Sequence, residues 1–309
     1  MQRTSNDFLA RLRFSFQMHF SLKFLKELAL YEEVQPYRLY DFPELSQEQQ
    51  TNCVFETVHG VFAQNLREIK WKPSIANEGF EFVKAPTRCS LAAAVFESES
   101  AESKRILDEY LRETMNLVHS RFAADSVVTI DWRFRRNDTA GPQSHDSLDF
   151  RKQAIAVAAA THCDFSYRGG FERLQMHLSR NEMMAVEEGK MRAMIVNVWR
   201  PLTPVKNAPL VLADRRTVSK RDVLEADQVM RDKVTKNAFV YHRSDQKWFW
   251  LPDQDPEEIF LFPTWKTEAD SLNADCSPHA AAYLHRPDSS ALPRESVEVR
   301  MIVLSRAVG

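Results

Sequence analysis

Glycine is scarce in this chain, with 7 residues among 309. Neither G-x-x-x-x-G-K nor G-x-G-x-x-G occurs, so the glycine-rich loops that hold phosphates are excluded. The 4 cysteines are scattered and contain no C-x-x-C pair, which favours reduced thiols in a cytoplasmic protein over a disulfide framework. We therefore expect neither a nucleotide-phosphate loop nor a disulfide-stabilised secreted fold.

Long hydrophobic runs and an excess charge of one sign are also lacking. The longest apolar runs, such as LAAAVF and AIAVAAA, are far too short to span a bilayer. Polar and charged residues interrupt the N-terminal apolar stretch, so it does not resemble a signal peptide. The formal net charge of -2 gives no electrostatic reason to expect nucleic acid or an anionic membrane as a partner.

One helical pattern is clear, and it precedes most of the β-like material. Over residues 101–120, apolar residues recur at steps of three and four, opposite a charged face. The later β-like segments are SVVTIDWRFRR, MIVNVWRPL, APLVLADRRTV, NAFVYHR, KWFWLPD, EEIFLFPTW and SVEVRMIVL. This order predicts a β-sandwich or jelly roll backed by helices rather than a parallel sheet.

Two turns are predicted within the β-like segments. The stretch TNCVFETVHGVFAQ alternates roughly and predicts a strand with a turn at Gly60. NAFVYHR and KWFWLPD are interpreted as two strands joined by a turn at Ser244-Asp245.

The run AIAVAAATHCDFSYRGG carries the first candidate for chemistry, because it ends in His162-Cys163-Asp164. In a strand, residues i and i+2 point the same way, so His162 and Asp164 would lie side by side with Cys163 turned away. An imidazole and a carboxylate are two of the three ligands of a non-heme iron site. They could equally form a His–Asp hydrogen bond at a strand end, and these three residues leave both interpretations open.

A second histidine is required if the pair binds iron. Four histidines lie downstream: His177, His242, His279 and His285. The first is too close and the second lies at a turn, whereas His279 falls between two strand-like segments and suits a penultimate core strand. Arg294-x-Ser296 follows where an anionic cosubstrate would need a cation, and a guanidinium pairs with a carboxylate through two hydrogen bonds. Arg300 has the same parity and is the rival.

Several longer motifs together resemble one family. NEGFEFVKAPT, SVVTIDWRFRR, THCDFS, MIVNVWRPL, VLADRRTV and RESVEVRMIV occur in order between about residues 35 and 305. They resemble the CmcJ/AsaB-type hydroxylase/desaturase family of Fe(II)/2-oxoglutarate-dependent oxygenases, which includes fungal endoperoxide-forming meroterpenoid oxygenases. The sequence departs from the family pattern at Cys163, at Phe165 and in FPTWKTEAD.

The resemblance implies a fold that is mainly β with flanking helices (α+β) around a double-stranded β-helix, a jelly-roll or cupin-like core. It implies Fe(II) held by His162, Asp164 and His279, with 2-oxoglutarate and O2 as cosubstrates. We expect one oxygenase domain over residues 1–309. Its predicted parts are a variable N-terminal segment (1–35), a helix-containing flank (36–120) and the β-helix core (121–309).

The expected reaction is oxidation of an apolar natural-product intermediate, a terpenoid or meroterpenoid, by hydrogen abstraction. Hydroxylation, desaturation and endoperoxide formation are all compatible with this chemistry. The alternatives are a non-catalytic jelly-roll binding protein and a metal-dependent dioxygenase that does not use 2-oxoglutarate. The aromatic N-terminal segment could pack on its own core or on a second subunit, so a homodimer is one predicted assembly.

Further site residues are expected around the triad. We predict that 2-oxoglutarate contacts Arg294, Ser296, Arg300 and Asn197. Asn197 and Trp199 alternate along one strand and could face the pocket together, with Arg200 turned away, although Trp199 could equally be core. The predicted substrate pocket contains Trp199, Tyr241 and Phe165.

Overall fold

Two β-sheets form the body of the protein, whose computed structural model describes residues 18–137, 155–284 and 290–307. The six-stranded sheet has the order β4 (Glu81–Lys84), β13 (Glu258–Lys266), β8 (Met191–Pro201), β16 (Glu295–Arg306), β5 (Ser126–Arg136) and β6 (Ile155–Ala156). The ten-stranded sheet has the order β15 (Tyr283–Leu284), β1 (His19–Leu25), β3 (Phe55–Asn65), β12 (Trp248–Trp250), β9 (Leu210–Ala213), β14 (His279–Ala281), β7 (His162–Cys163), β11 (Val234–Val240), β10 (Val223–Val229) and β2 (Tyr37–Leu39).

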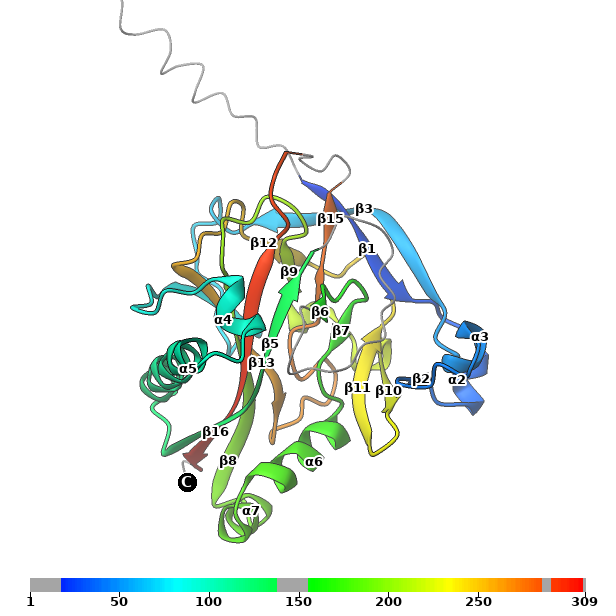
Figure 1. Cartoon of the computed structure of the whole chain (residues 1–309). Helices are drawn as coiled ribbons and strands as arrows, with labels where there is room; N and C mark the ends of the chain where they lie inside the picture. Colours follow the sequence, from blue (N-terminus) through cyan, green and yellow to red (C-terminus); the bar gives the residue numbers. More distant parts are fainter. Residues whose placement is uncertain (1–17, 138–154, 285–289, 308–309) are drawn as a thin grey trace, which may run out of the picture.

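Helices are fewer than strands and lie at the periphery. They are α2 (Leu30–Glu33), α3 (Gln47–Gln50), α4 (Ala93–Glu97), α5 (Ala101–Phe122), α6 (Tyr167–His177) and α7 (Arg180–Glu187), with short 3-10 turns η1 (Arg215–Thr217) and η2 (Lys220–Asp222). In Figure 1, α4 and α5 lie on one side of β16 and β8, and β7, β10 and β11 lie on the other. No helix in the described ranges has the length and apolar composition needed to cross a membrane.

The long helix α5 confirms the pattern predicted over residues 101–120. It begins after Ser100, whose hydroxyl accepts a hydrogen bond from the backbone N–H of Ser103, and it ends at Ala123 in the left-handed conformation (φ 45°). Its buried face carries Tyr110 and Val118, which belong to one apolar cluster with strands β8, β13 and β16. The helix therefore covers the outer face of the six-stranded sheet.

Strand β16 has two chemically different faces because side chains alternate along a strand. Val297, Val299 and Met301 belong to the apolar cluster beneath α5. The intervening residues Ser296, Glu298 and Arg300 are also buried, but they lie on the inner face between the two sheets. The alternation thus places polar groups inside the protein, where they need specific partners.

The predicted turn at Gly60 is wrong, because β3 continues through this residue. The pairing of β1 with β3 shifts register between Phe20 and Leu22, opposite Val61 and Val58, so Gly60 (φ 76°) lies in a β-bulge. A bulge needs an unusual backbone conformation without ending the strand, and glycine supplies it.

The predicted turn at Ser244-Asp245 is present, but β11 and β12 are not neighbours. Strands β9, β14 and β7 lie between them in the sheet. Local alternation predicted both strands but could not identify their partners, because pairing depends on distant segments.

The ten-stranded sheet takes strands from all three predicted parts of the chain, and the six-stranded sheet takes strands from the last two. β1 lies within residues 1–35, and β3 and β4 lie within 36–120, yet they pair with strands of the later region. The predicted limits at residues 35 and 120 are therefore not limits of the sheets. The single oxygenase domain over 1–309 stays a prediction.

Candidate metal centre

Two histidines and one aspartate converge between the sheets. β7 and β14 are adjacent antiparallel strands, and the register places His279 directly opposite His162, with ring centroids 4.4 Å apart. Asp164 follows β7 two residues after His162. One ligand atom from each residue lies within 4.8 Å of the other two. The structure therefore brings together the three residues predicted as metal ligands.

Backbone carbonyls fix the tautomer of both imidazoles. Nδ1 of His162 lies 2.8 Å from the carbonyl oxygen of Ala160, and Nδ1 of His279 lies 3.2 Å from that of Ser277. A carbonyl oxygen can only accept, so each Nδ1 carries the proton and donates. The Nε2 atoms keep their lone pairs, and they lie 3.3 Å (His162) and 3.9 Å (His279) from Oδ1 of Asp164.

Asp164 is oriented from the opposite sheet. Nδ2 of Asn197 on β8 donates to its Oδ2 across 2.6 Å, and Nη1 of Arg300 on β16 lies 3.9 Å from the same oxygen. Burial alone would raise the pKa of Asp164, but its contact with His162 and the nearby guanidinium of Arg300 hold it well below its usual range. Asp164 is therefore an ionised carboxylate available as a ligand.

Burial keeps His279 neutral. Desolvation and the neighbouring His162 lower the pKa of His279 to about 3. A neutral imidazole with a free Nε2 is the form that binds metal, and two imidazoles with one carboxylate are the donor set typical of non-heme Fe(II) sites with open positions. The residues present therefore fit a divalent iron ion.

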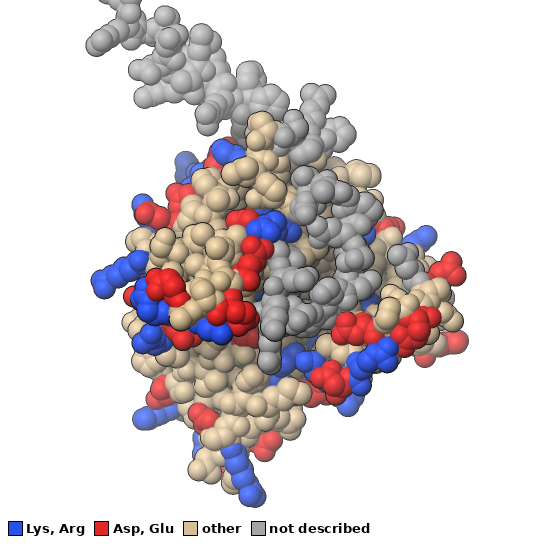
Figure 2. All heavy atoms as spheres, viewed as in Figure 1, with Lys and Arg blue, Asp and Glu red and all other residues tan. Residues whose placement is uncertain are grey.

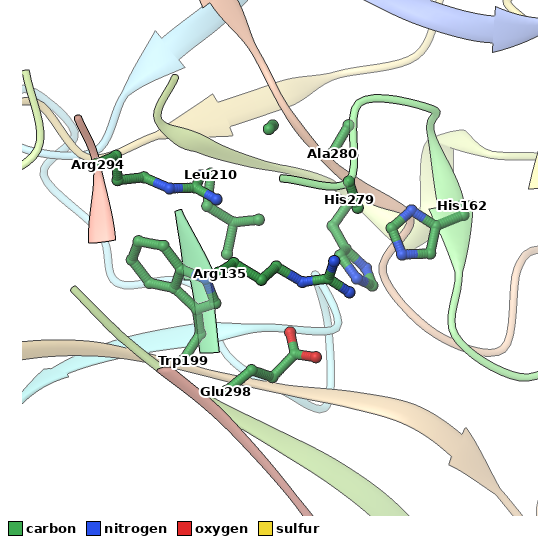
Figure 3. Close-up of a pocket in the computed structure, with 10 residues that line it drawn as sticks. Arg135, His162, Trp199, Leu210, His279, Ala280, Arg294 and Glu298 are labelled. Carbon is green, nitrogen blue, oxygen red and sulfur yellow. The ribbon is translucent and has the colours of Figure 1, made fainter. Parts of the chain in front are cut away.

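A cavity opens beside the two histidines. Its walls come from both sheets: Arg135, Ala158, His162, Trp199, Leu210, His279, Ala280, Ala281, Arg294 and Glu298. In Figure 3, Arg135 reaches toward His279 with the carboxyl group of Glu298 beside it, and Arg294 lies near Trp199. The cavity thus combines an apolar wall with charged groups close to the triad.

Arg294 lies in this cavity with donors to spare. Its Nη1 donates to the carbonyl oxygen of Ala208 at 2.6 Å, and its guanidinium lies 5.4 Å from the ring centroid of Trp199. Nε of Arg294 and Oγ of Ser296 are buried and have no hydrogen-bond partner among the described residues. Burial and the nearby Arg135 lower the pKa of Arg294 to about 9, which leaves it charged at neutral pH.

Arg300 is already bound within the protein. Its Nε and Nη2 each donate to Asp131 at 2.6 Å, and its guanidinium lies 5.3 Å from the ring centroid of Phe165. It does not line the cavity. The geometry therefore separates the two predicted rivals, because Arg294 has open donors in the cavity and Arg300 supports Asp164 and Asp131.

The remaining predicted residues are divided between cavity and core. Trp199 lines the cavity, and Asn197 lies behind Asp164 rather than in the cavity wall. Phe165 packs in an apolar cluster with α6 and α7, and Tyr241 packs with Leu25, Tyr31 and Phe239, so neither lines the cavity. His285 lies outside the described residues.

Arg200 and Cys163 point away from the cavity, as the alternation predicts. Arg200 donates to the hydroxyl of Tyr110 and to the backbone carbonyls of Pro256 and Ala85. Cys163 packs against Cys276, and both thiols are free. A hydrogen bond with Cys276, together with burial, raises the pKa of Cys163, so its thiol is an inert packed group.

Two charged cavity residues, Arg135 and Glu298, are absent from the sequence prediction. Both could have been found by alternation: Arg135 shares its parity with Asp131 and Arg133 on β5, and Glu298 lies between Ser296 and Arg300 on β16. Both residues alternate with apolar residues of the core, so the two segments are typical of core strands.

Comparisons with known proteins find oxidoreductases, among them a dioxygenase and a hydroxylase/desaturase. The family model described as an oxidoreductase/YMDC permease-like domain matches residues 22–304. The alpha-ketoglutarate-dependent dioxygenase tstK of Talaromyces stipitatus is 24% identical over 249 residues, covering 79% of this chain and 84% of that protein. The hydroxylase/desaturase efuI of Hormonema carpetanum is 25% identical over 258 residues, covering 79% of this chain and 82% of its own length. The predicted resemblance to hydroxylase/desaturase proteins is confirmed.

Solved structures confirm the predicted fold class. The iron and alpha-ketoglutarate-dependent endoperoxidase NvfI superposes with a TM-score of 0.74 at 21% identity, covering 94% of this chain and 98% of that one. A TM-score of this size over nearly the whole chain shows a shared jelly-roll fold.

Proposed function

The chain belongs to the oxidoreductase/YMDC permease-like family, and on this premise we propose that it is an Fe(II)- and 2-oxoglutarate-dependent oxygenase acting on a small molecule. One observation carries the proposal: the two histidines of the His162–Asp164–His279 triad line the same cavity as Arg294, whose Nε has no hydrogen-bond partner among the described residues. A metal that leaves open positions and a buried cation at its side fit a keto acid with a second carboxylate.

Each part of the cosubstrate has a matching group in this site. His162, Asp164 and His279 would hold the iron, which supplies the O2 chemistry that couples oxidative decarboxylation of 2-oxoglutarate to hydrogen abstraction from the substrate. The guanidinium of Arg294 and the hydroxyl of Ser296 bind the distal carboxylate, which satisfies two buried donors. Asn197 keeps Asp164 oriented toward the histidines.

The apolar wall supports a substrate with an apolar body. Trp199, Leu210 and Ala280 line the cavity, and burial of such surfaces excludes water from the reacting groups. We extend the proposal to a natural product of the terpenoid or meroterpenoid class. Hydroxylation, desaturation and endoperoxide formation all remain compatible with this site.

The proposal also covers the assembly and the cellular location of the protein. We propose a cytoplasmic enzyme and a homodimer as one assembly. In Figure 2, basic and acidic side chains are interspersed over the visible face, which supports a small molecule rather than a nucleic acid as the partner.

Calorimetric titration under anaerobic conditions tests the cosubstrate site. The iron-loaded protein is titrated with 2-oxoglutarate and with 2-oxobutanoate, which lacks the distal carboxylate. We expect wild type to prefer 2-oxoglutarate by at least about tenfold, and Arg294→Gln to lose this preference. Arg306→Gln, exposed at the end of β16, is the control that keeps it.

Two results would overturn the proposal. Iron binding without 2-oxoglutarate binding would favour a metal-dependent dioxygenase that does not use the keto acid. A folded protein that binds neither would favour a non-catalytic jelly-roll binding protein.

A further inference from the structure

The interior around the cavity holds more positive than negative side chains. Among the residues that the structure describes, the charged groups clustered there include five arginines and three carboxylates: Arg133, Arg135, Arg173, Arg294, Arg300, Asp131, Asp164 and Glu298. Asp131 pairs with Arg300 at 2.6 Å and with Arg133 at 3.0 Å. The carboxylates are thus fewer than the guanidinium groups they could neutralise, and an uncompensated buried charge is costly.

Arg135 is a second cation in the cavity wall, and the proposed cosubstrate does not pair with it. Its Nη1 donates to the backbone carbonyl of Ala156 at 3.0 Å, and no carboxylate of the described residues lies within 4.0 Å of it. It stands opposite Ser296 in the pairing of β5 with β16, and its guanidinium extends toward His279 (Figure 3). A cation beside the metal ligands has open donors aimed at the place where a substrate would bind.

The proposed cosubstrate does not neutralise Arg135. Its distal carboxylate is bound by Arg294 and Ser296, and its proximal carboxylate, together with Asp164, balances the charge of Fe(II). Arg135 therefore stays charged in the wall of the cavity after iron and 2-oxoglutarate have bound. An anion from the remaining ligand, the primary substrate, would satisfy it.

Glu298 does not supply that anion. It lies beside Arg135 in the cavity, but the two form no ion pair within 4.0 Å. Burial raises the pKa of Glu298 and so favours its neutral form. A neutral carboxyl can donate a hydrogen bond to the same anion that a neighbouring guanidinium binds.

We propose that Arg135, with Glu298 beside it, binds a carboxylate of the primary substrate, so that the enzyme acts on a carboxylic acid with an apolar body. This inference rests on the proposed oxygenase function, and it adds the chemical class of the substrate. Trp199, Leu210 and Ala280 contact the apolar body, and Arg135 places the acid group at a fixed distance from the metal ligands. The reacting carbon is thereby selected by its distance from the carboxylate.

The test compares the binding of a carboxylic acid with the binding of its uncharged amide analogue. Wild-type protein is loaded anaerobically with Fe(II) and 2-oxoglutarate, so that no turnover occurs, and equilibrium dialysis measures the binding of 4-phenylbutanoate and 4-phenylbutanamide. We expect the acid to bind at least about tenfold more tightly than the amide. Arg135→Gln should remove this preference and change the affinity for 2-oxoglutarate less than about threefold.

Arg136→Gln is the matched control. Arg136 is the next residue on β5, it faces outward, and it pairs with Glu97 and Glu295. The control should keep the full preference for the acid. The melting temperature of each variant shows that it is folded, and Arg135→Lys should restore part of the preference because it retains the charge.

Three outcomes would overturn the inference. In the first, the acid binds no more tightly than the amide, including the case in which neither binds at millimolar concentration. In the second, Arg135→Gln keeps the preference. In the third, it loses 2-oxoglutarate binding, which would assign Arg135 to the cosubstrate. Failure of the proposed function is seen separately, in the loading step, as the absence of iron-dependent 2-oxoglutarate binding.

Discussion

The side-chain amide of Asn197 donates to Oδ2 of Asp164 across 2.6 Å and so connects the two sheets at the His162–Asp164–His279 triad. The hydroxyl of Thr264 lies 3.4 Å from Oδ1 of the same amide, which fixes its orientation. Asp164 follows a strand of the ten-stranded sheet, and Asn197 belongs to the six-stranded sheet. The position of one predicted metal ligand is therefore set by the opposite wall of the fold.

Loss of this hydrogen bond should weaken metal binding. We expect Asn197→Ala to lower the affinity for Fe(II) by about 10- to 100-fold, because partners that orient a ligand contribute on this scale. Competition with a chromophoric chelator under anaerobic conditions measures the affinity. Asn65→Ala, at the end of β3, removes an amide that accepts from the backbone N–H of Arg67 and does not contact the triad, and it should leave the affinity unchanged. Equal affinities for Asn197→Ala and wild type would contradict the assigned role.

Stability of the metal-free protein should fall as the pH is lowered. The pKa of His279 is about 3 in the folded protein because of burial and the nearby His162, against an ordinary value of 6.5. The unfolded chain therefore binds the extra proton first. The contribution of neutral His279 is complete above about pH 6.5 and is lost progressively as the pH falls toward about 3.

Urea unfolding with a chelator present measures this dependence between about pH 7 and pH 4.5, which stays above the ordinary pKa of Asp164. His279 contributes a slope of up to about 1.4 kcal/mol per pH unit. We expect His279→Gln to remove this slope and His119→Gln, on the exposed face of α5, to retain it. Identical slopes in His279→Gln and wild type would show that His279 is not buried as a neutral group.

Two glycines let α6 begin directly after the metal-binding segment. An added Cβ at Gly170 would lie 2.1 Å from the ring of Trp265, and one at Gly169 would lie 2.1 Å from the carbonyl oxygen of Lys236. We expect Gly170→Ala to destabilise the protein by about 1–3 kcal/mol, because a buried indole and a strand must shift. Arg168→Ala, exposed in the same turn, should cost less than about 0.5 kcal/mol. A thermal melt of both variants checks this, and equal melting temperatures would contradict it.

Arg300 should matter for stability more than for cosubstrate affinity. Arg300→Gln removes the two hydrogen bonds to Asp131 and leaves that half-buried carboxylate with Arg133 as its remaining ion-pair partner. We expect a loss of at least about 2 kcal/mol in the free energy of unfolding. Arg306→Gln breaks an exposed pair with Asp125 on the same strand and should cost less than about 1 kcal/mol. A small loss in Arg300→Gln would show that the Arg300–Asp131 pair is not a stabilising contact.

The triad could be predicted in part because its signal is local. His162 and Asp164 are two residues apart, and His279 lies between two strand-like segments, but these features left a plain His–Asp hydrogen bond open. The full ligand set came from the resemblance to the oxygenase family. Arg294 and Ser296 followed from the same reasoning on the last strand. The order of a helical pattern followed by short strands likewise predicted the fold class.

The other site residues depend on contacts between distant strands. Arg135 enters the cavity because β5 lies beside β16, and Tyr241 leaves it because its strand end packs on Leu25 and Tyr31. No local pattern separates an inward-facing arginine that pairs with a carboxylate, such as Arg300, from one that donates only to a backbone carbonyl among the described residues, such as Arg135. The bulge at Gly60 and the separation of β11 from β12 are also set by pairing partners.

The most direct test of the central claim is an anaerobic titration of Fe(II) into the protein with and without 2-oxoglutarate, followed by visible absorption. We predict a weak metal-to-ligand charge-transfer band that requires both iron and the keto acid and disappears in His279→Ala. A folded wild-type protein that binds iron and 2-oxoglutarate without this band, or that binds neither, would contradict the account.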